Sequence, residues 1–302
     1  MQETRHAAAQ AHSESFVAGA HHPDGHQPET RDVVGPPRGK VFASGSLTGM
    51  HWHGDPQPGI RHVASAPTRS QRLSAGALID AHRHDDHQIV YAGRGVLTVD
   101  TDAGSWVAPA TRAIWIPAGT VHAHQAHGNA ELHLIGLHLD DNPLGLREPT
   151  VLGVTPLLRE LIFAYTRPPH DETPPRVRLR AVLLDQLRTA VQQPLHLPAP
   201  TEPRLQEVCA ILRDNPADQR TLAALGREVG ASERTLSRLF KAECAMTFPQ
   251  WRTQLRLHHA LLMLADGIPV TSVAHRCGWA SASAFIDTFR RAFGHTPGQY
   301  LR

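Results

Sequence analysis

Two copies of one helix–turn–helix pattern lie in the C-terminal third of this 302-residue chain. In the first copy, Thr221 opens a short apolar helix, Gly230 provides the turn, and Ser232 caps a second, amphipathic helix that we expect to run through Lys241. Glycine suits the turn because a residue without Cβ adopts positive φ freely. A short helix, a glycine turn and a longer polar-faced helix form the layout that places a recognition helix in the major groove of DNA.

The second copy repeats this order. Val270 begins a short helix, the turn glycine Gly278 lies 48 positions after Gly230, and Ser281 is placed to cap the next helix. The apolar face predicted for that helix consists of Phe285, Ile286, Phe289 and Phe293. Two such patterns in one segment favour a DNA-binding domain far more strongly than one would.

Helical spacing identifies the side chains expected to face DNA. In the first recognition helix these are Arg234, Thr235, Ser237, Arg238 and Lys241, while Leu236, Leu239 and Phe240 are expected to pack inward. In the second they are Ser283, Ile286 and Asp287, with Arg290 and Arg291 nearer the phosphates. Arginine binding guanine O6 and N7 is the commonest specific contact, whereas an acid can accept from cytosine N4 but repels phosphate. We therefore expect the second motif to bind less tightly than the first.

The charge distribution agrees with this interpretation. Residues 204–302 contain 13 Lys and Arg and 8 Asp and Glu, so this segment carries a net charge of +5 within a chain of net charge +2. Positive charge is therefore concentrated in the segment expected to bind phosphates.

The segment from Thr221 to Tyr300 resembles the DNA-binding domain of AraC/XylS-type transcriptional regulators, and residues 280–300 match the spacing of that family's signature. The resemblance implies seven helices, with two helix–turn–helix units joined by a long helix. The residues support such a connector, because Pro249 suits a first helical turn and apolar residues recur at helical spacing from 250 to 265, before Gly267.

Composition divides the rest of the chain. Residues 1–65 are rich in Ala, His, Gly, Pro and Ser without periodicity, which predicts a disordered tail. Residues 193–203 are proline-rich, which predicts a stiff, extended linker between a sensor domain at 66–192 and the DNA-binding domain at 204–302.

Hydropathy and cysteine usage indicate the cellular compartment in which we expect the protein. The sequence has no run of 18 apolar residues and no apolar N-terminal stretch typical of a signal peptide, so we expect a cytoplasmic protein without a membrane partner. The three cysteines, Cys209, Cys244 and Cys277, are not spaced as a metal site. They are expected to be reduced and to fill small apolar gaps, a redox sensor being the alternative.

Between residues 72 and 140, turn signals every 8–12 residues predict an all-β sandwich or barrel. Two stretches with helical periodicity follow, at 155–165 and 175–191. These helices would either cap the barrel or form a dimer interface, and the family resemblance favours the interface. The fold class expected for the whole chain is therefore α+β multidomain.

Two segments of this region resemble the motifs of cupins. Residues 76–95 resemble the first motif and residues 117–126 the second. His82 and His84 are two positions apart, so on a strand they point to one face. Gln88 would begin the next strand and His122 would follow the turn of the second motif, so that the four side chains can converge inside a barrel. Three imidazoles and one oxygen suit Zn²⁺, Fe²⁺, Ni²⁺ or Mn²⁺.

Two departures from the cupin pattern affect the chemistry. Gln88 replaces the usual glutamate and Ala126 the later asparagine, which weakens the case for turnover more than the case for metal binding. Three interpretations stay open: a metal site, a metal-free pocket in which these histidines bind an effector, and histidines that only stabilise the core. His124 has the same strand parity as His122 and can also face inward. We assign structural roles to His87, His127, His133 and His138.

The leading functional hypothesis is a sequence-specific DNA-binding regulator, activator or repressor, controlled by a small molecule or metal in the barrel. Such a protein would act on double-stranded promoter DNA as a homodimer and would meet RNA polymerase there. The alternatives are a cupin-type metal-dependent enzyme fused to a DNA-binding domain, or a barrel that serves only for dimerisation. Gln88 counts against the enzyme, which would need a carboxylate ligand.

Overall fold

The computed structural model describes residues 60–193 and 196–300. Most of the expected tail lies outside these residues. Its expected end at residue 65 is wrong, because Arg61–Val63 form strand β1, which pairs in parallel with β3. A strand of three residues has too little alternation to be recognised, and its partner, not its own sequence, defines it.

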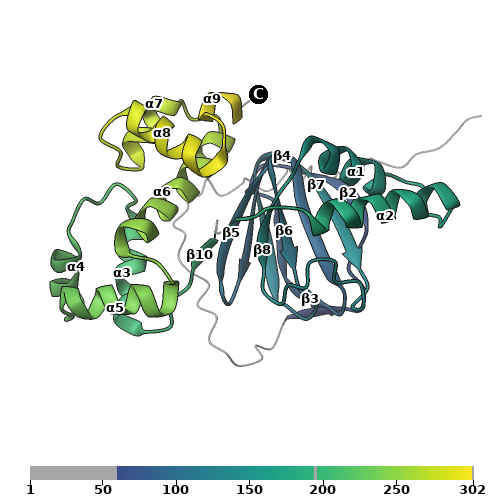
Figure 1. Cartoon of the computed structure of the whole chain (residues 1–302). Helices are drawn as coiled ribbons and strands as arrows, with labels where there is room; N and C mark the ends of the chain where they lie inside the picture. The colour runs from purple at the N-terminus through teal and green to yellow at the C-terminus, as the bar shows by residue number, and fades with distance from the viewer. Residues whose placement is uncertain (1–59, 194–195, 301–302) are drawn as a thin grey trace, which may run out of the picture. The chain divides into compact units, whose positions relative to one another are not determined.

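The first half of the described chain forms a single hydrogen-bonded sheet of ten strands (Figure 1). We call this sheet and the two helices that follow β8 the strand domain. The path through the sheet is β1-β3-β7-β4-β6-β8-β9, with β2 paired to β7 and β5 paired to both β4 and β10. The strands are β1 (Arg61–Val63), β2 (Arg69–Leu73), β3 (Leu78–His84), β4 (His87–Thr101), β5 (Gly104–Pro109), β6 (Arg112–Ile116), β7 (His122–Leu137), β8 (Thr150–Gly153), β9 (Gln192–Gln193) and β10 (His196–Pro198).

Alternation along the strands builds two apolar layers. On β4, Val90 and Ala92 belong to one buried cluster, while Ile89 and Tyr91 belong to another. This period of two is what a strand buried on both faces requires. The second cluster also contains Trp115, and the helices pack on it.

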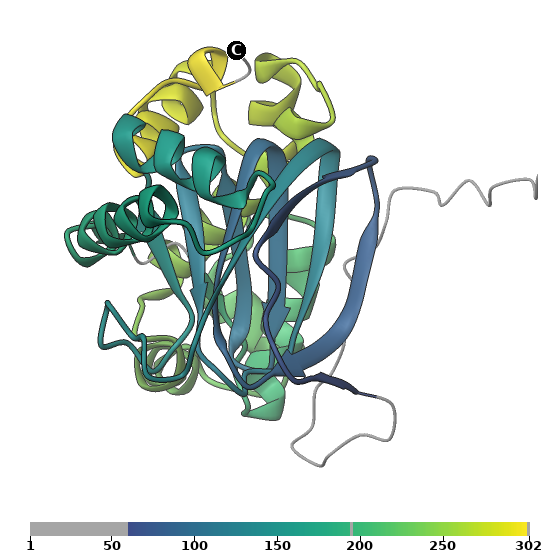
Figure 2. The ribbon, with the colours of Figure 1, turned by 90° about the vertical axis from the view of Figure 1, so that its right-hand side faces the viewer.

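Two helices cover that second face, as Figure 2 shows in teal. They are α1 (Pro156–Thr166) and α2 (Pro174–Arg188), and Thr155 and Thr173 cap their N-termini. Their buried side chains, Leu158, Ile162, Leu183 and Leu187, pack against the sheet. Each also exposes apolar residues, since Leu157 is 53% and Val182 44% accessible. The helices therefore cap the sheet and still expose single apolar side chains, among charged ones such as Arg178 and Asp185.

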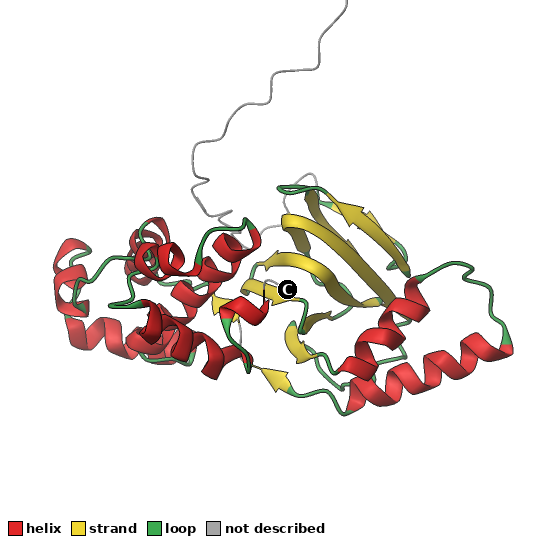
Figure 3. Ribbon diagram, turned by 90° about the horizontal axis from the view of Figure 1, so that it is seen from above, coloured by secondary structure: helices red, strands yellow, loops and turns green. Residues whose placement is uncertain are grey.

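The second half of the chain, which we call the helical domain, consists of helices alone after β10 (Figure 3). Within the described residues the seven helices expected from the family are present: α3 (Pro203–Asp214), α4 (Leu222–Glu228), α5 (Glu233–Cys244), α6 (Phe248–Ala265), α7 (Val270–Arg276), α8 (Ala282–Phe293) and α9 (Pro297–Tyr300). None of the described helices is long and apolar enough to cross a membrane.

The local signals for both helix–turn–helix units are confirmed. Thr221, Ser232 and Ser281 cap α4, α5 and α8 through their side chains, and Gly230 and Gly278 have φ of 67° and 77°. The predicted end of α5 at Lys241 is wrong by one turn. Its buried stripe continues from Leu236 and Phe240 to Cys244, so packing against the core extends the helix beyond the last polar signal.

Part of the proline-rich linker, His196–Pro198, is strand β10 and not a free spacer. Leu197 lies opposite Ser105, in the antiparallel pair that β10 forms with β5, so backbone hydrogen bonds hold part of the linker. Glu202 then caps α3, with Pro203 in its first turn. The linker sequence contained no signal for this pairing because the partner strand lies far away in the chain.

Candidate functional site

Three histidines of the strand domain gather at one point, and we call them the histidine cluster: His82, His84 and His122. The burial pattern of β3 places His82 and His84 on the inner face with Arg83 exposed between them. His122 begins β7 directly opposite His82. One ring nitrogen from each histidine lies within 4.8 Å of the other two, which is close enough for all three to bind a single atom.

A short turn holds the two motifs together. Gly119 has φ of 78°, and its N–H donates to the carbonyl oxygen of His84 at 2.8 Å. A residue with a side chain would be strained at this φ. The turn therefore joins the end of β3 to the start of β7, where His122 stands.

Hydrogen bonds to the backbone orient all three rings. Each Nδ1 lies within hydrogen-bonding distance of a carbonyl oxygen two residues earlier or later. The distances are 2.8 Å from His82 to Asp80, 2.7 Å from His84 to Asp86, and 2.9 Å from His122 to Thr120. A carbonyl oxygen only accepts, so each Nδ1 carries the proton and each Nε2 presents a lone pair. Metal-binding histidines are oriented in this way by their outer-shell partners.

The lone pairs of the histidine cluster lack protein donors. Nε2 of His84 and of His122 has no hydrogen-bond partner among the described residues, although both atoms are buried. Leaving a buried acceptor unsatisfied costs about 1–3 kcal/mol. His82 is 8% exposed and His122 0%, so all three rings are largely shielded from water. An electron-pair acceptor at the centre would satisfy all three rings at once.

Burial keeps the rings of His82 and His122 neutral. Desolvation lowers the pKa of His122 to about 3. The hydrogen bond to Thr120 opposes this shift, and the nearby His82 and His84 add to it. Desolvation also lowers the pKa of His82, against the hydrogen bond to Asp80. Both are therefore in the neutral form that coordinates metals near pH 7.

A fourth histidine extends the histidine cluster. The ring centroid of His124 lies 5.0 Å from that of His122 and 5.7 Å from that of His82, and its buried Nδ1 has no partner among the described residues. Burial lowers its pKa well below the usual value. His124 thus lies beside the cluster, as its strand parity suggested.

Gln88 is buried near the start of β4, opposite Ile116 on β6 and Gly136 on β7. Its Oε1 has no partner in the described part of the chain. Gln88 therefore keeps an unsatisfied oxygen and adds no charge. Its assignment as the fourth ligand stays a prediction.

The remaining histidines of the domain have other contacts. Nδ1 of His87 accepts from the N–H of Ala118, and its Nε2 then donates to Leu139 O at 3.1 Å. His127 bonds the hydroxyl of Thr98 at 2.9 Å and His133 that of Thr166 at 2.7 Å. His138 is exposed. These contacts give the buried ones a packing role outside the histidine cluster.

The candidate DNA-binding residues of α5 divide into two groups. Arg234, Ser237, Arg238 and Lys241 are exposed on one face, opposite the buried Leu236, Phe240 and Cys244. Thr235 is half-buried, and its hydroxyl lies 2.8 Å from that of Ser232. Thr235 therefore takes part in the cap at the start of the helix.

The candidates on α8 have more internal partners. Ser283, Asp287, Arg290 and Arg291 are exposed, whereas Ile286 is half-buried. Arg290 lies 3.4 Å from the carboxylate of Asp287, and Nε of Arg291 donates to the Asp287 carbonyl at 3.3 Å. Asp287 thus neutralises part of the positive charge on this helix.

The three cysteines are buried and unpaired. Burial raises the pKa of Cys244 to about 11 and that of Cys277 to about 12. The thiolate is the reactive form, so these cysteines are unreactive near neutral pH.

Sequence reasoning missed two groups of supporting residues. The carbonyl partners Asp80, Asp86 and Thr120 each stand two positions from a histidine, and this spacing is a signal that could have found them. A polar network in the helical domain was also missed, because the arginines that bind its loop carbonyls, Arg252 and Arg256, lie 32 to 40 positions away in the sequence.

Comparisons with known proteins agree with both halves. A family model described as a helix-turn-helix domain matches residues 225–302, and one described as a cupin domain matches residues 69–138. The chain is 35% identical over 225 residues to the HTH-type transcriptional regulator NimR of Escherichia coli K12, covering 73% of this chain and 81% of NimR.

Two further similarities are confined to about one third of the chain. The HTH-type transcriptional regulator RipA of Corynebacterium glutamicum is 36% identical over 104 residues, which is 34% of this chain and 31% of RipA. A crystal structure of a DNA-binding transcriptional dual regulator from Escherichia coli K-12 is 30% identical, with a TM-score of 0.31, and covers 33% of this chain and 91% of that one.

Proposed function

Because this chain belongs to the AraC/XylS-type family of transcriptional regulators, we propose that a divalent metal ion bound by His82, His84 and His122 controls how its two helix–turn–helix units bind promoter DNA. The observation that carries this proposal is the convergence of three buried imidazoles whose Nδ1–H groups are already bonded to the backbone. A rigid set of lone pairs suits a cation.

A metal explains the site better than an organic effector that binds these atoms directly. An organic molecule would have to bring several donors to a space in which the ligand nitrogens are within 4.8 Å of one another. A single ion accepts all three lone pairs at once. Imidazole ligands suit Zn²⁺, Fe²⁺ and Ni²⁺ among the candidate ions. Gln88 or His124 would supply a fourth ligand.

The proposal makes the cupin domain a sensor and not a catalyst. The histidine cluster contains no carboxylate, and the buried Gln88 stands where an enzyme of this fold would use glutamate. The relatives named above are transcriptional regulators. A sensor needs only a difference in metal affinity between two states, typically ~1–3 kcal/mol.

The protein is further proposed to act in the cytoplasm as a homodimer, meeting RNA polymerase at the promoter. The exposed apolar residues of the cap, Leu157, Val177 and Val182, support pairing of two copies through α1 and α2. A dimer would place four recognition helices on repeated half-sites and would gain affinity through effective concentration.

The test is a metal titration of the full-length protein after chelator treatment. Zn²⁺, Fe²⁺, Ni²⁺ and Mn²⁺ are added separately, and bound metal and affinity for an operator selected in vitro are both measured. At least one ion should bind one per chain and change operator affinity about 5–150-fold. His82→Ala and His122→Ala should abolish both effects, whereas His138→Ala, an exposed histidine outside the cluster, should not. If wild type binds none of the ions, the histidines act without a metal.

A further inference from the structure

We propose that the loop between α3 and α4, residues 215–220, fixes the spacing at which the two recognition helices reach DNA, by binding the connector α6 and the turn of the second motif at the same time. This inference rests on the assignment of α5 and α8 as recognition helices. None of the side chains assigned to DNA contact belongs to this loop.

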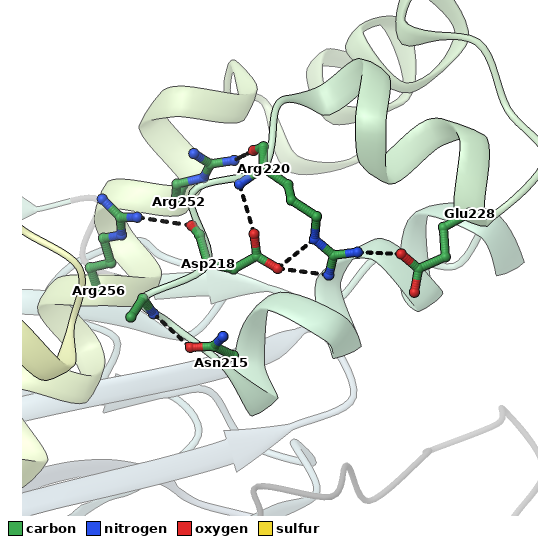
Figure 4. A network of polar contacts seen from close by, with 7 residues as sticks. Asn215, Asp218, Arg220, Glu228, Arg252 and Arg256 are labelled. Carbon is green, nitrogen blue, oxygen red and sulfur yellow. Dashed lines mark hydrogen bonds and ion pairs between the residues drawn. The ribbon is translucent and has the colours of Figure 1, made fainter.

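The 215–220 loop is first anchored to α6, as Figure 4 shows. Nε of Arg256 donates to the carbonyl of Pro216 at 2.9 Å, and a terminal nitrogen of the same guanidinium donates to the carbonyl of Asp218 at 3.1 Å. Arg252, one turn earlier on α6, donates to the carbonyl of Arg220. Arginine remains charged at any relevant pH, so these are charge-assisted hydrogen bonds, the stronger kind.

The same loop contacts the second motif at its turn. The side-chain amide of Gln219 donates to the carbonyl of Gly278 at 2.7 Å. A Cβ added at Gly278 would lie 2.7 Å from Cα of Ala217 and 3.0 Å from both the Arg256 guanidinium and the Gln219 amide. Glycine is therefore needed at Gly278 twice, for its φ of 77° and for this close approach.

The loop is also fixed to the first motif. Asp218 is buried, accepts the backbone N–H of Arg220 at 2.7 Å, and pairs with the Arg220 guanidinium. Burial opposes ionisation of Asp218, but the hydrogen bonds and charge of Arg220 lower its pKa overall. Arg220 in turn pairs with Glu228 on α4. This exposed ion pair adds little, but the loop runs directly into α4, whose N-cap is Thr221, so a displacement of the loop would move α4 with it.

These contacts form one mechanical connection from α4 through the loop to α6 and to the α7–α8 turn. Without the loop, α6 alone would join the two motifs, and rotation at either end of α6 would change the separation of α5 and α8. With it, the two recognition helices are held at one separation. Two sequence boxes at one fixed spacing then become a geometric requirement and not merely a preference.

The experiment measures affinity against half-site spacing with the full-length protein. An operator selected in vitro is compared with versions in which one or two base pairs are added or removed between the two sequence boxes, and with a version whose second box is scrambled. Wild type should lose about tenfold or more in affinity when the spacing changes, because bivalent binding is lost when geometry forbids simultaneous engagement.

Gln219→Ala and Arg256→Lys should reduce that spacing penalty to about threefold or less, because the loop no longer holds α6 and the Gly278 turn together. Affinity for the scrambled-box DNA, which reports the first motif alone, should stay at the wild-type value. Glu228→Gln is the matched control, since it changes the same network only on the α4 side and should keep the sharp spacing dependence.

Three outcomes would overturn the inference. These are a wild-type spacing penalty in Gln219→Ala, an equal loss of affinity at every spacing, or a loss of spacing dependence in Glu228→Gln as well. Gln219 is exposed and offers one hydrogen bond to the turn, so its variant remains informative if Arg256→Lys does not fold. Failure of the recognition-helix assignment is seen separately, as wild-type operator affinity in Arg238→Ala.

Discussion

Replacing His122 by phenylalanine should have opposite consequences without and with metal. In the metal-free chain the substitution removes the hydrogen bond from Nδ1 to Thr120, a loss of about 0.5–1.5 kcal/mol. It also removes a buried unsatisfied Nε2, whose desolvation penalty is about 1–3 kcal/mol. These two effects oppose each other, so the free energy of unfolding should rise by roughly 0–2 kcal/mol or stay unchanged.

With metal present the sign reverses. A ligand at 100 times its Kd stabilises the folded state by about 2.7 kcal/mol. In a domain of this size the Tm rises by about 4 °C per kcal/mol of stabilisation, so metal binding should raise the Tm by about 10 °C. The shift should appear in wild type and in His138→Phe, which replaces an exposed histidine, and should be absent in His122→Phe.

The assay is thermal unfolding of the full-length protein, followed by circular dichroism in chelator and then in each metal at saturating concentration. The reasoning is refuted if metal-free His122→Phe is several kcal/mol less stable than wild type, because that is the behaviour of a satisfied core histidine. It is refuted equally if metal raises the Tm of His122→Phe as much as that of wild type.

Four further predictions concern the helical domain and the cap. Arg238→Ala should weaken operator binding by about 1–3 kcal/mol without changing the Tm, as measured by a binding assay on matched and mismatched sites; unchanged affinity and specificity would remove Arg238 from the DNA interface. Asp287→Ala should alter base preference at the half-site of α8, and an unaltered preference in a selection experiment would show that Asp287 does not contact bases. Val182→Asp should convert the proposed dimer to a monomer in sedimentation at micromolar concentration, and a wild-type dimer with an unchanged sedimentation coefficient in the variant would place the interface elsewhere. Burial, followed by the charge of Arg213, lowers the pKa of His259 to about 4. The unfolded chain therefore binds a proton that the folded chain does not between about pH 6.5 and pH 4, and stability should fall with decreasing pH in this window by up to about 1.4 kcal/mol per pH unit. His259→Gln should flatten that slope, and a slope equal to that of wild type would contradict the assignment.

The features predicted from the sequence are those that depend on neighbouring residues. Thr221, Ser232 and Ser281 cap helices through side-chain bonds to an N–H three residues later, so the cap and its helix lie in one short window. The parity of His82 and His84 is equally local, because two residues on one strand must share a face.

The features that were missed depend on partners far away in the chain. Strand β1 exists because it pairs with β3, and β10 because it pairs with β5. The 215–220 loop has no helical or strand periodicity, and its role appears only when Arg256 and Gly278 lie against it. Tertiary pairing of this kind leaves no period in the sequence to detect.

The neutrality of the histidine cluster connects its chemistry to its role. In the proposed metal site, three imidazoles and the predicted fourth ligand Gln88 would give a divalent ion no negative charge, so its +2 charge would stay uncompensated among buried residues. Burying a charge without a partner is costly, which weakens binding relative to a site with glutamate. Weaker binding is a handicap for an enzyme that must keep its ion, but it lets occupancy follow the free metal concentration. The presence of Gln88 in place of glutamate counts against turnover. For the same reason it favours a reversible sensor, whose signal is the difference between its occupied and empty states.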